Sequence, residues 1–205
     1  MLRRKKGYIL LAMLVLTGLA GTVKPTATTV KERKTVVTGL KESRDNLFSQ
    51  VSKLSLAQLT FKPSLQQPSI AELLQIQLEL EKNTWQIFKN TMADNTNACN
   101  KYEPVADNNN QTTVETIANH KVVKAMDLPQ YTTPHASLLA NNFKTLRKEV
   151  ITYARTTTED LKNNYIATGD GDISAYNCFL LLSRQTDIIT AHITAIKKQP
   201  LFPKE

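Results

Sequence analysis

The sequence predicts an all-α fold, a four-helix bundle with a long crossover between its second and third helices. Apolar residues recur at spacings of three and four in four segments of about 20 residues, the pattern of helices that bury one face. No segment shows strand-like alternation of useful length. The chain of 205 residues has room for one domain, which we expect at residues 31–203.

The chain begins with a pattern typical of a signal peptide. Basic residues 3–6 are followed by an apolar run and by small residues up to Ala20, after which cleavage is expected. The apolar stretch of about 13 to 16 residues is shorter than the roughly 20 that span a bilayer; an uncleaved N-terminal anchor is the alternative. We therefore expect an exported protein of the bacterial periplasm or cell envelope, with residues 21–30 as a linker.

The positive charge of the chain gives little support to nucleic-acid binding. Four basic residues lie in the leader, so the formal net charge of +8 falls to +4 without it. The other cations, such as Arg147, Lys148, Lys197 and Lys198, are spread along the chain without interleaved aromatics. We expect them on solvated helix faces and expect no nucleic-acid partner.

The first helix is predicted over residues 31–53. Its apolar face consists of Val36, Leu40, Leu47, Val51 and Leu54. Pro63 and Pro68 forbid a continuous helix through residues 55–68. We therefore expect the first helix to end before this segment and the second helix to begin after it.

The second helix is predicted to begin directly after Pro68 and to end near Met92. Ser69 is a suitable N-cap, and Glu72 three residues later completes a capping-box pattern. The apolar face consists of Ile70, Leu73, Leu74, Leu80 and Phe88. Glu79 shares a face with Glu72, and we interpret that face as solvated.

The crossover covers residues 94–133. Its clusters of Asn and Asp favour turns, and a short helix is predicted at 112–126. The packing side of that helix consists of Val114, Ile117, Val122 and Met126. A connection of this length can return along a whole helix, so both up-down-up-down and up-down-down-up orders are permitted.

Two further helices complete the prediction. The third covers 135–156, with an a/d seam formed by Leu139, Phe143, Leu146, Val150 and Tyr153. The fourth covers 173–198, with Asp172 as its N-cap. The preceding glycines, Gly169 and Gly171, indicate a turn, since the segment lacks the ligands of a calcium loop.

The chain offers no recognised catalytic motif. His120, His135 and His192 have no histidine partner at helical spacing, so a histidine metal site is not indicated. Neither Cys99 nor Cys178 shows a neighbouring base that would make it a nucleophile. The residues alone therefore point to no reaction.

Several segments resemble motifs of the DinB/YfiT-like superfamily. These are LSLAQLTFKP at 54–63, SIAELL at 69–74, TEDLK at 158–162, LLLS at 180–183 and PLFP at 200–203. The resemblance covers about 31–203 and rests on the order and spacing of the motifs. It implies a four-helix bundle of up-down-down-up order, often with a three-histidine divalent-metal site. The family includes thiol-dependent transferases and is frequently dimeric, so a homodimer is in keeping with it.

On this resemblance the three metal-binding histidines fall on Ile76, Gln185 and Ile189. Isoleucine has no lone pair and a single amide is a weak ligand, so we expect a degenerate site and no metal cofactor. Branched apolar side chains at these positions would fill the cavity. An offset site that uses polar residues nearby is the alternative; the candidates are Glu72, Gln77 and His192.

The helix order also bears on the two cysteines. In up-down-down-up order, Cys99 and Cys178 lie at the same end of the bundle, within range of a disulfide, which an oxidising compartment would permit. In the other order they lie a helix length apart. Two free buried thiols are the alternative.

These observations predict an exported helical bundle that acts as a non-catalytic binding or structural module. The alternative is an enzyme, either a metal-dependent transferase or hydrolase of the DinB-like type with displaced ligands, or one without a metal. A third interpretation is a partner protein tethered to the membrane through the N-terminal apolar segment. The sequence names no ligand, substrate or partner.

Overall fold

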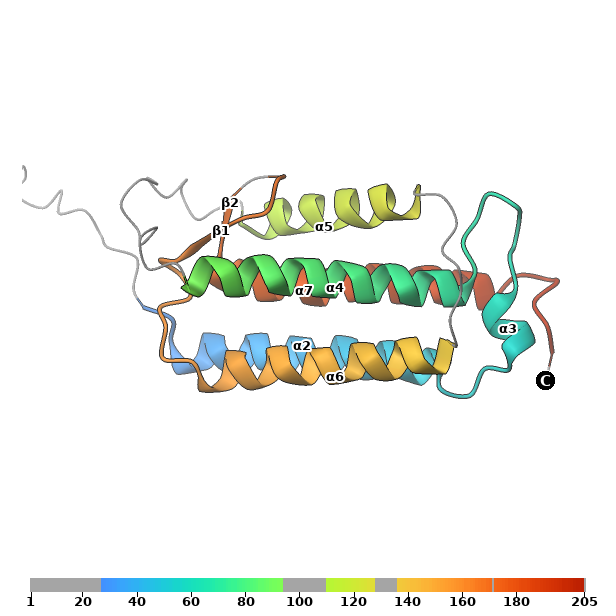
Figure 1. Cartoon of the computed structure of the whole chain (residues 1–205), viewed down its shortest axis with the longest axis horizontal. Helices are drawn as coiled ribbons and strands as arrows, with labels where there is room; N and C mark the ends of the chain where they lie inside the picture. The colour runs from blue at the N-terminus through green and yellow to red at the C-terminus, as the bar shows by residue number, and fades with distance from the viewer. Residues whose placement is uncertain (1–26, 94–109, 128–135, 171, 205) are drawn as a thin grey trace, which may run out of the picture.

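A computed structural model describes residues 27–93, 110–127, 136–170 and 172–204 of the chain (Figure 1). The predicted leader at 1–20 lies outside these residues, as do Cys99 and His135. Four long helices make the bundle: α2 (Val30–Val51), α4 (Ile70–Ala93), α6 (Ala136–Thr156) and α7 (Ala175–Lys197). The shorter elements are α3 (Leu56–Thr60), α5 (Asn110–Met126), β1 (Tyr165–Ala167) and β2 (Asp172–Ser174).

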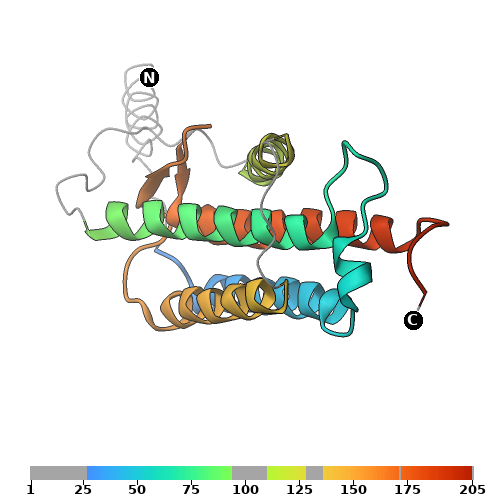
Figure 2. The same cartoon turned by 45° about the vertical axis from the view of Figure 1, so that its right-hand side comes forward.

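The four long helices run up-down-down-up. Helices α2 and α7 run in one direction along the bundle, and α4 and α6 run in the other (Figure 1). Each of α2 and α4 packs against both α6 and α7. Helix α5 lies outside this square of helices, against α7 and α4, as Figures 1 and 2 both show. The predicted four-helix bundle is therefore confirmed, with the crossover helix as an added layer.

Side chains cap the N-termini of α2, α3 and α4. The Ser69 N–H donates to Glu72 Oε2 at 2.7 Å, and the Glu72 N–H donates to Ser69 Oγ at 3.2 Å. This is the capping box that the sequence predicts for α4. Thr29 and Glu32 make the same arrangement at the start of α2, and Ser55 begins α3 in the same way.

The segment before α7 differs from the prediction. Residues 172–174 form β2, which pairs antiparallel with β1 through the partners Tyr165–Ser174, Ile166–Ile173 and Ala167–Asp172. The prediction of Asp172 as N-cap is wrong: the cap is Ser174, whose Oγ accepts from the Asn177 N–H. The reason is that Ile173 is buried within the ladder, which keeps this segment extended.

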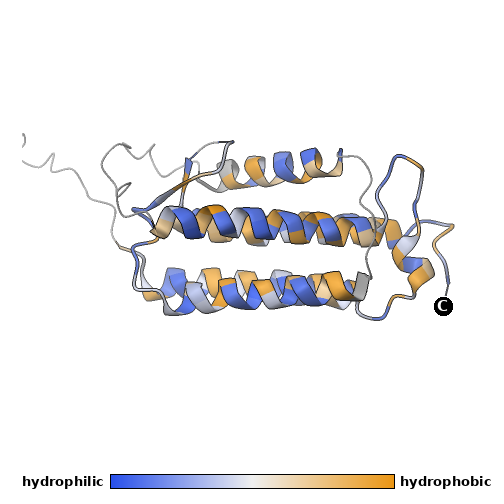
Figure 3. Ribbon diagram, in the orientation of Figure 1, coloured by the Kyte–Doolittle hydropathy of each residue, from blue (hydrophilic) through white to orange (hydrophobic). Residues whose placement is uncertain are grey.

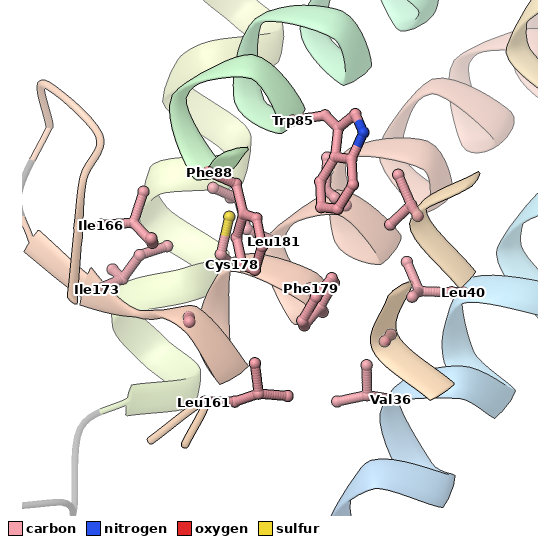
Figure 4. Close-up of a cluster of buried hydrophobic side chains, with 14 of the residues drawn as sticks. Val36, Leu40, Trp85, Phe88, Leu161, Ile166, Ile173, Cys178, Phe179 and Leu181 are labelled. Atoms are coloured by element: carbon pink, nitrogen blue, oxygen red, sulfur yellow. The ribbon is translucent and has the colours of Figure 1, made fainter. Parts of the chain in front are cut away.

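The core follows the predicted apolar faces. Hydrophobic residues lie along the sides of the helices that meet one another (Figure 3). At the hairpin end, Trp85, Phe88 and Phe179 pack together beside Cys178 (Figure 4), with 5.0 Å between the ring centroids of Trp85 and Phe88. At the other end a second cluster includes Leu47, Leu73 and Phe143 among its residues. These two clusters hold the long helices in place.

Candidate functional site

The three positions at which the resemblance places metal ligands lie in the interior of the bundle. Ile76 on α4 is 1% exposed, and Gln185 and Ile189 on α7 are 0% exposed. Gln185 and Ile189 are four residues apart and therefore share one face of α7. Ile76 and Ile189 belong to the same buried hydrophobic cluster. Hydrocarbon therefore occupies two of the three ligand positions.

Helix α5 contributes to the same cluster. It lies on the α4 and α7 side of the bundle (Figure 2), and its Val122 is fully buried with Ile76 and Ile189. An ion pair between Glu115 of α5 and Arg184 of α7 ties the two helices together at their surface. Helix α5 therefore covers the face of the bundle above these positions.

The residues at this site do not fit a divalent metal ion. Isoleucine offers no donor atom, which leaves the amide of Gln185 as the single polar group among the three. In the described parts of the chain, no three or more His, Cys, Asp and Glu side chains are grouped so as to hold a metal ion. The geometry therefore offers no metal chemistry at these positions.

Among the described residues, the amides of Gln77 and Gln185 are fully buried and lack partners. Gln77 on α4 and Gln185 on α7 are both fully buried, and the side-chain nitrogen and oxygen of each have no hydrogen-bond partner. A buried amide normally bonds protein or ordered water, and leaving it unpaired costs about 1–3 kcal/mol. These amides are the polar remainder of the site, and they add an energetic cost to the fold.

The other candidate ligands have different surroundings. Glu72 Oε1 pairs with Lys62 Nζ at 2.8 Å, and its second oxygen serves the helix cap. Burial raises the pKa of Glu72, but the hydrogen bonds from Lys62 and Ser69 outweigh it, and the pKa lies below its usual value. His192 is exposed on α7. Glu72 is thus already satisfied, which leaves it no free role as a general base or a ligand.

A buried ion pair that the sequence analysis missed lies at the centre of the bundle. Arg147 and Glu81 are fully buried and make two parallel hydrogen bonds, Nε to Oε1 at 2.5 Å and Nη2 to Oε2 at 2.6 Å. The prediction that Arg147 lies on a solvated face is wrong. The sequence does contain a pattern that predicts this burial. Residue 147 lies four residues after Phe143 and three before Val150, which places it in the a/d seam of α6.

The remaining donors of Arg147 reach two other helices. Nη1 donates to Ser43 Oγ at 3.0 Å and to the Leu40 carbonyl of α2 at 3.3 Å. Nη2 donates to Thr186 Oγ1 at 2.8 Å and to the Leu182 carbonyl of α7 at 3.0 Å. Together with Glu81 of α4, this network joins all four long helices. It is closed to solvent and fully bonded, so its role is structural.

Cys178 lies in the aromatic cluster at the hairpin end and is fully buried. Burial, together with the nearby charge of Glu81, raises the pKa of its thiol to about 12. The thiol is therefore protonated at neutral pH and is no nucleophile. Since Cys99 lies outside the described residues, the proposed pairing of the two cysteines stays a prediction.

The exposed histidine of α5 belongs to a contact with the hairpin. His120 Nδ1 lies 2.9 Å from Asp170 Oδ1, and Lys121 Nζ lies 3.1 Å from Asp170 Oδ2. Lys121 also donates to the Thr168 carbonyl at 2.9 Å. These contacts hold α5 against the turn between β1 and β2.

Among the described residues, no helix is long and apolar enough to cross a membrane.

Comparison with known proteins gives one informative match. No family model matches the sequence, and no curated protein matches it. A solved structure, described as "YfiT from Bacillus subtilis is a probable metal-dependent hydrolase with an unusual four-helix bundle topology", matches with a TM-score of 0.57. The two chains are 16% identical over 87% of this chain and 94% of that one. The comparison shows that the fold is the one the sequence resemblance predicts.

Proposed function

We propose that this chain, which has the DinB/YfiT-like four-helix fold, is a non-catalytic binding or structural module of the bacterial cell envelope. The observation that carries the proposal is the packing of Ile76 and Ile189 in one buried cluster with Val122 of α5. In a metal site these positions would hold imidazoles around an ion that is open to a substrate. Here Ile76 and Ile189 place branched hydrocarbon side chains at these positions, and helix α5 packs over them.

The electrostatics of the bundle support the same proposal. An ion placed between Ile76 and Ile189 would lose its hydration without gaining ligands, which costs several kcal/mol or more. The fully buried carboxylate of α4, that of Glu81, is already neutralised by Arg147 through two hydrogen bonds. Neither an ion nor a reacting group therefore finds a free charged partner at this depth.

The alternative is a metal-dependent transferase or hydrolase of the DinB-like type with displaced ligands. The fold likeness to a protein described as a probable metal-dependent hydrolase favours it. It requires Glu72 to leave Lys62 and the α4 cap, and it requires the exposed His192 to turn inward. The first change would give up contacts that the fold already uses, and the second would move an exposed side chain into the interior, so we place this alternative second.

Metal analysis of the purified protein tests the proposal. We expect sub-stoichiometric zinc, nickel and manganese after dialysis, and no saturable heat of binding when each ion is titrated into the protein. A chelator should leave the unfolding temperature unchanged, because no metal contributes to folding. Stoichiometric binding of any of these ions, lost in a Glu72→Gln or His192→Ala variant, would establish the displaced-ligand alternative instead.

The envelope location is a separate part of the proposal, and the leader pattern at residues 1–20 supports it. The mature protein is expected to begin at Gly21. N-terminal sequencing of protein recovered from the producing bacterium checks this. A chain that keeps residue 1 and fractionates with membranes would favour the tethered form, and one found in the cytoplasm would remove the envelope from the proposal.

A further inference from the structure

One end of the bundle combines exposed leucines with positive charge. Helix α3, the loop that joins it to α4 and the C-terminal tail all lie at this end, opposite the hairpin and the start of α2 (Figures 1 and 2). We call it the α3 end. Three leucines here are among the most exposed large apolar residues described: Leu56 is 72% exposed, Leu65 97% and Leu201 83%.

These leucines stand on ordered structure. The tail that bears Leu201 is held against α3 by a hydrogen bond from Gln58 Nε2 to the Pro203 carbonyl at 3.0 Å. The rings of Phe61 and Phe202 meet edge to face, with centroids 5.6 Å apart. Leu56 lies in the first turn of α3, directly after its capping residue. The fold thus fixes the positions from which Leu56 and Leu201 project into solvent.

Lysines outnumber acidic residues in the segments that form the α3 end, although Glu205 directly follows Lys204. Residues 46–71 and 188–204 contain five lysines and no Asp or Glu. Lys53, Lys198 and Lys204 are exposed. One acidic residue, Glu72, pairs with Lys62 at 2.8 Å. The surface around the three leucines is therefore positively charged.

We infer that the α3 end docks on the surface of a bilayer that contains anionic phospholipid. Lysines attract anionic headgroups at about 1 kcal/mol each, and leucines that project from a folded surface enter the boundary between headgroups and acyl chains. The α3 end is separate from the buried positions of Ile76, Gln185 and Ile189. The inference therefore does not depend on the proposal that the protein is non-catalytic.

The residue types favour lipid over other anionic partners. The two acid-free segments contain no arginine, although arginine is the cation preferred in protein interfaces and in nucleic-acid recognition, and lysine is depleted in protein interfaces. The leucines come from three separate segments rather than from one continuous groove. A fluid lipid boundary accepts separated apolar side chains without a matching shape, whereas a protein partner requires one.

Vesicle flotation of the full chain tests the inference. Vesicles of phosphatidylglycerol and phosphatidylcholine in equal parts are compared with vesicles of phosphatidylcholine alone. We expect stronger partitioning onto the anionic vesicles, weakened by salt. The variant Lys53→Gln/Lys198→Gln/Lys204→Gln should lower the partition coefficient about fivefold per lysine, and Leu56→Ser/Leu65→Ser/Leu201→Ser should lower it by about tenfold.

The opposite end of the bundle supplies a matched control. Val30 is 86% exposed at the start of α2, next to the exposed Lys31 and near the exposed Lys34. Val30→Ser/Lys31→Gln/Lys34→Gln should bind vesicles as the unaltered chain does. All variants carry the same N-terminal residues 1–26, so binding that is driven by the leader would be equal in all of them and would overturn the inference.

Two further outcomes would also overturn it. The first is equal partitioning onto neutral and anionic vesicles. The second is self-association that the leucine variant abolishes, seen by sedimentation, without any difference in vesicle binding; this result would assign the α3 end to a second copy of the chain. Because all substituted side chains are exposed, circular dichroism should be unchanged throughout, and the measurement reports binding rather than folding.

Discussion

Arg147 and Glu81 face each other at the centre of the bundle as a two-point ion pair, with neither side chain exposed. A buried pair of this kind adds little net stability over a well-packed apolar pair, because each charge loses its hydration. The balance changes when one partner is removed, since the other charge is then buried without compensation. The pair therefore makes the fold sensitive to single substitutions at either residue.

Replacing Arg147 with methionine should destabilise the protein by about 3–5 kcal/mol, because it leaves the Glu81 carboxylate buried and unpaired. Urea unfolding followed by circular dichroism measures this effect. The double variant Arg147→Met/Glu81→Met should recover much of the loss.

The exposed Arg155 of the same helix serves as control, and Arg155→Met should stay within about 0.5 kcal/mol of the unaltered protein. If Arg147→Met were as stable as the double variant, Glu81 would have found another partner or water. The ion pair would then not make the fold sensitive to single substitutions.

Ile189→Ala and Ile76→Ala should each cost about 2–5 kcal/mol, since both side chains are buried in one cluster and truncation leaves a cavity. The urea midpoint measures the cost. Ile87 of α4, which is 38% exposed, gives the matched control Ile87→Ala with a small effect. If the two core variants were as stable as this control, Ile76 and Ile189 would line an open, solvated pocket. Hydrocarbon would then not fill the positions of the metal ligands.

Local signals predicted most of the bundle. The pattern at Ser69 and Glu72 identifies the start of α4 because a capping box needs only neighbouring residues. The seam of α6 identifies a buried face because its period is set by the helix itself. The sequence does not predict the hairpin, because β1 and β2 have three residues each, too few for a strand period to show. Its pairing takes Ile173 out of the predicted helix and Asp172 out of the predicted N-cap position.

The site required information that periodicity does not contain. Ile76 and Ile189 are ordinary core residues by their spacing, and only the resemblance marks them as ligand positions. The general preference of charged side chains for solvent predicts an exposed Arg147, whereas its position in the seam predicts the burial that the structure shows. Its partners come from α2, α4 and α7, so tertiary structure alone identifies them. The position of α5 over the cluster likewise depends on long-range packing.

Glu32→Gln should weaken the fold at neutral pH and leave it unchanged in strong acid. Hydrogen bonds from Lys162 and from the Thr29 N–H lower the pKa of Glu32 from 4.5 to about 2. The folded state thus binds this proton less readily than the unfolded state, and the carboxylate stabilises the fold above about pH 4.5, a contribution lost as the pH falls towards 2.

Thermal unfolding between neutral pH and pH 2 measures the Glu32 effect. The Glu32 side chain is 31% exposed, so solvent screens its pair with Lys162 and the shift in unfolding temperature should be modest. The exposed Glu42, also on α2, supplies the control variant Glu42→Gln. A difference between Glu32→Gln and the unaltered chain that persists unchanged at pH 2 would show that packing, and not charge, is responsible.

Gln185→Met and Gln77→Met should stabilise the protein, which is unusual for substitutions in a core. Both amides are fully buried without hydrogen-bond partners, and methionine keeps their length and removes their polar atoms. We expect a gain of roughly 1–2 kcal/mol for each variant in urea unfolding. The exposed Gln66, replaced in the same way, should have little effect. A loss of stability in either core variant would mean that its amide bonds a partner in solution, such as a buried water molecule or a polar ligand, and the interior next to Ile76 and Ile189 would then be a binding site rather than a filled one.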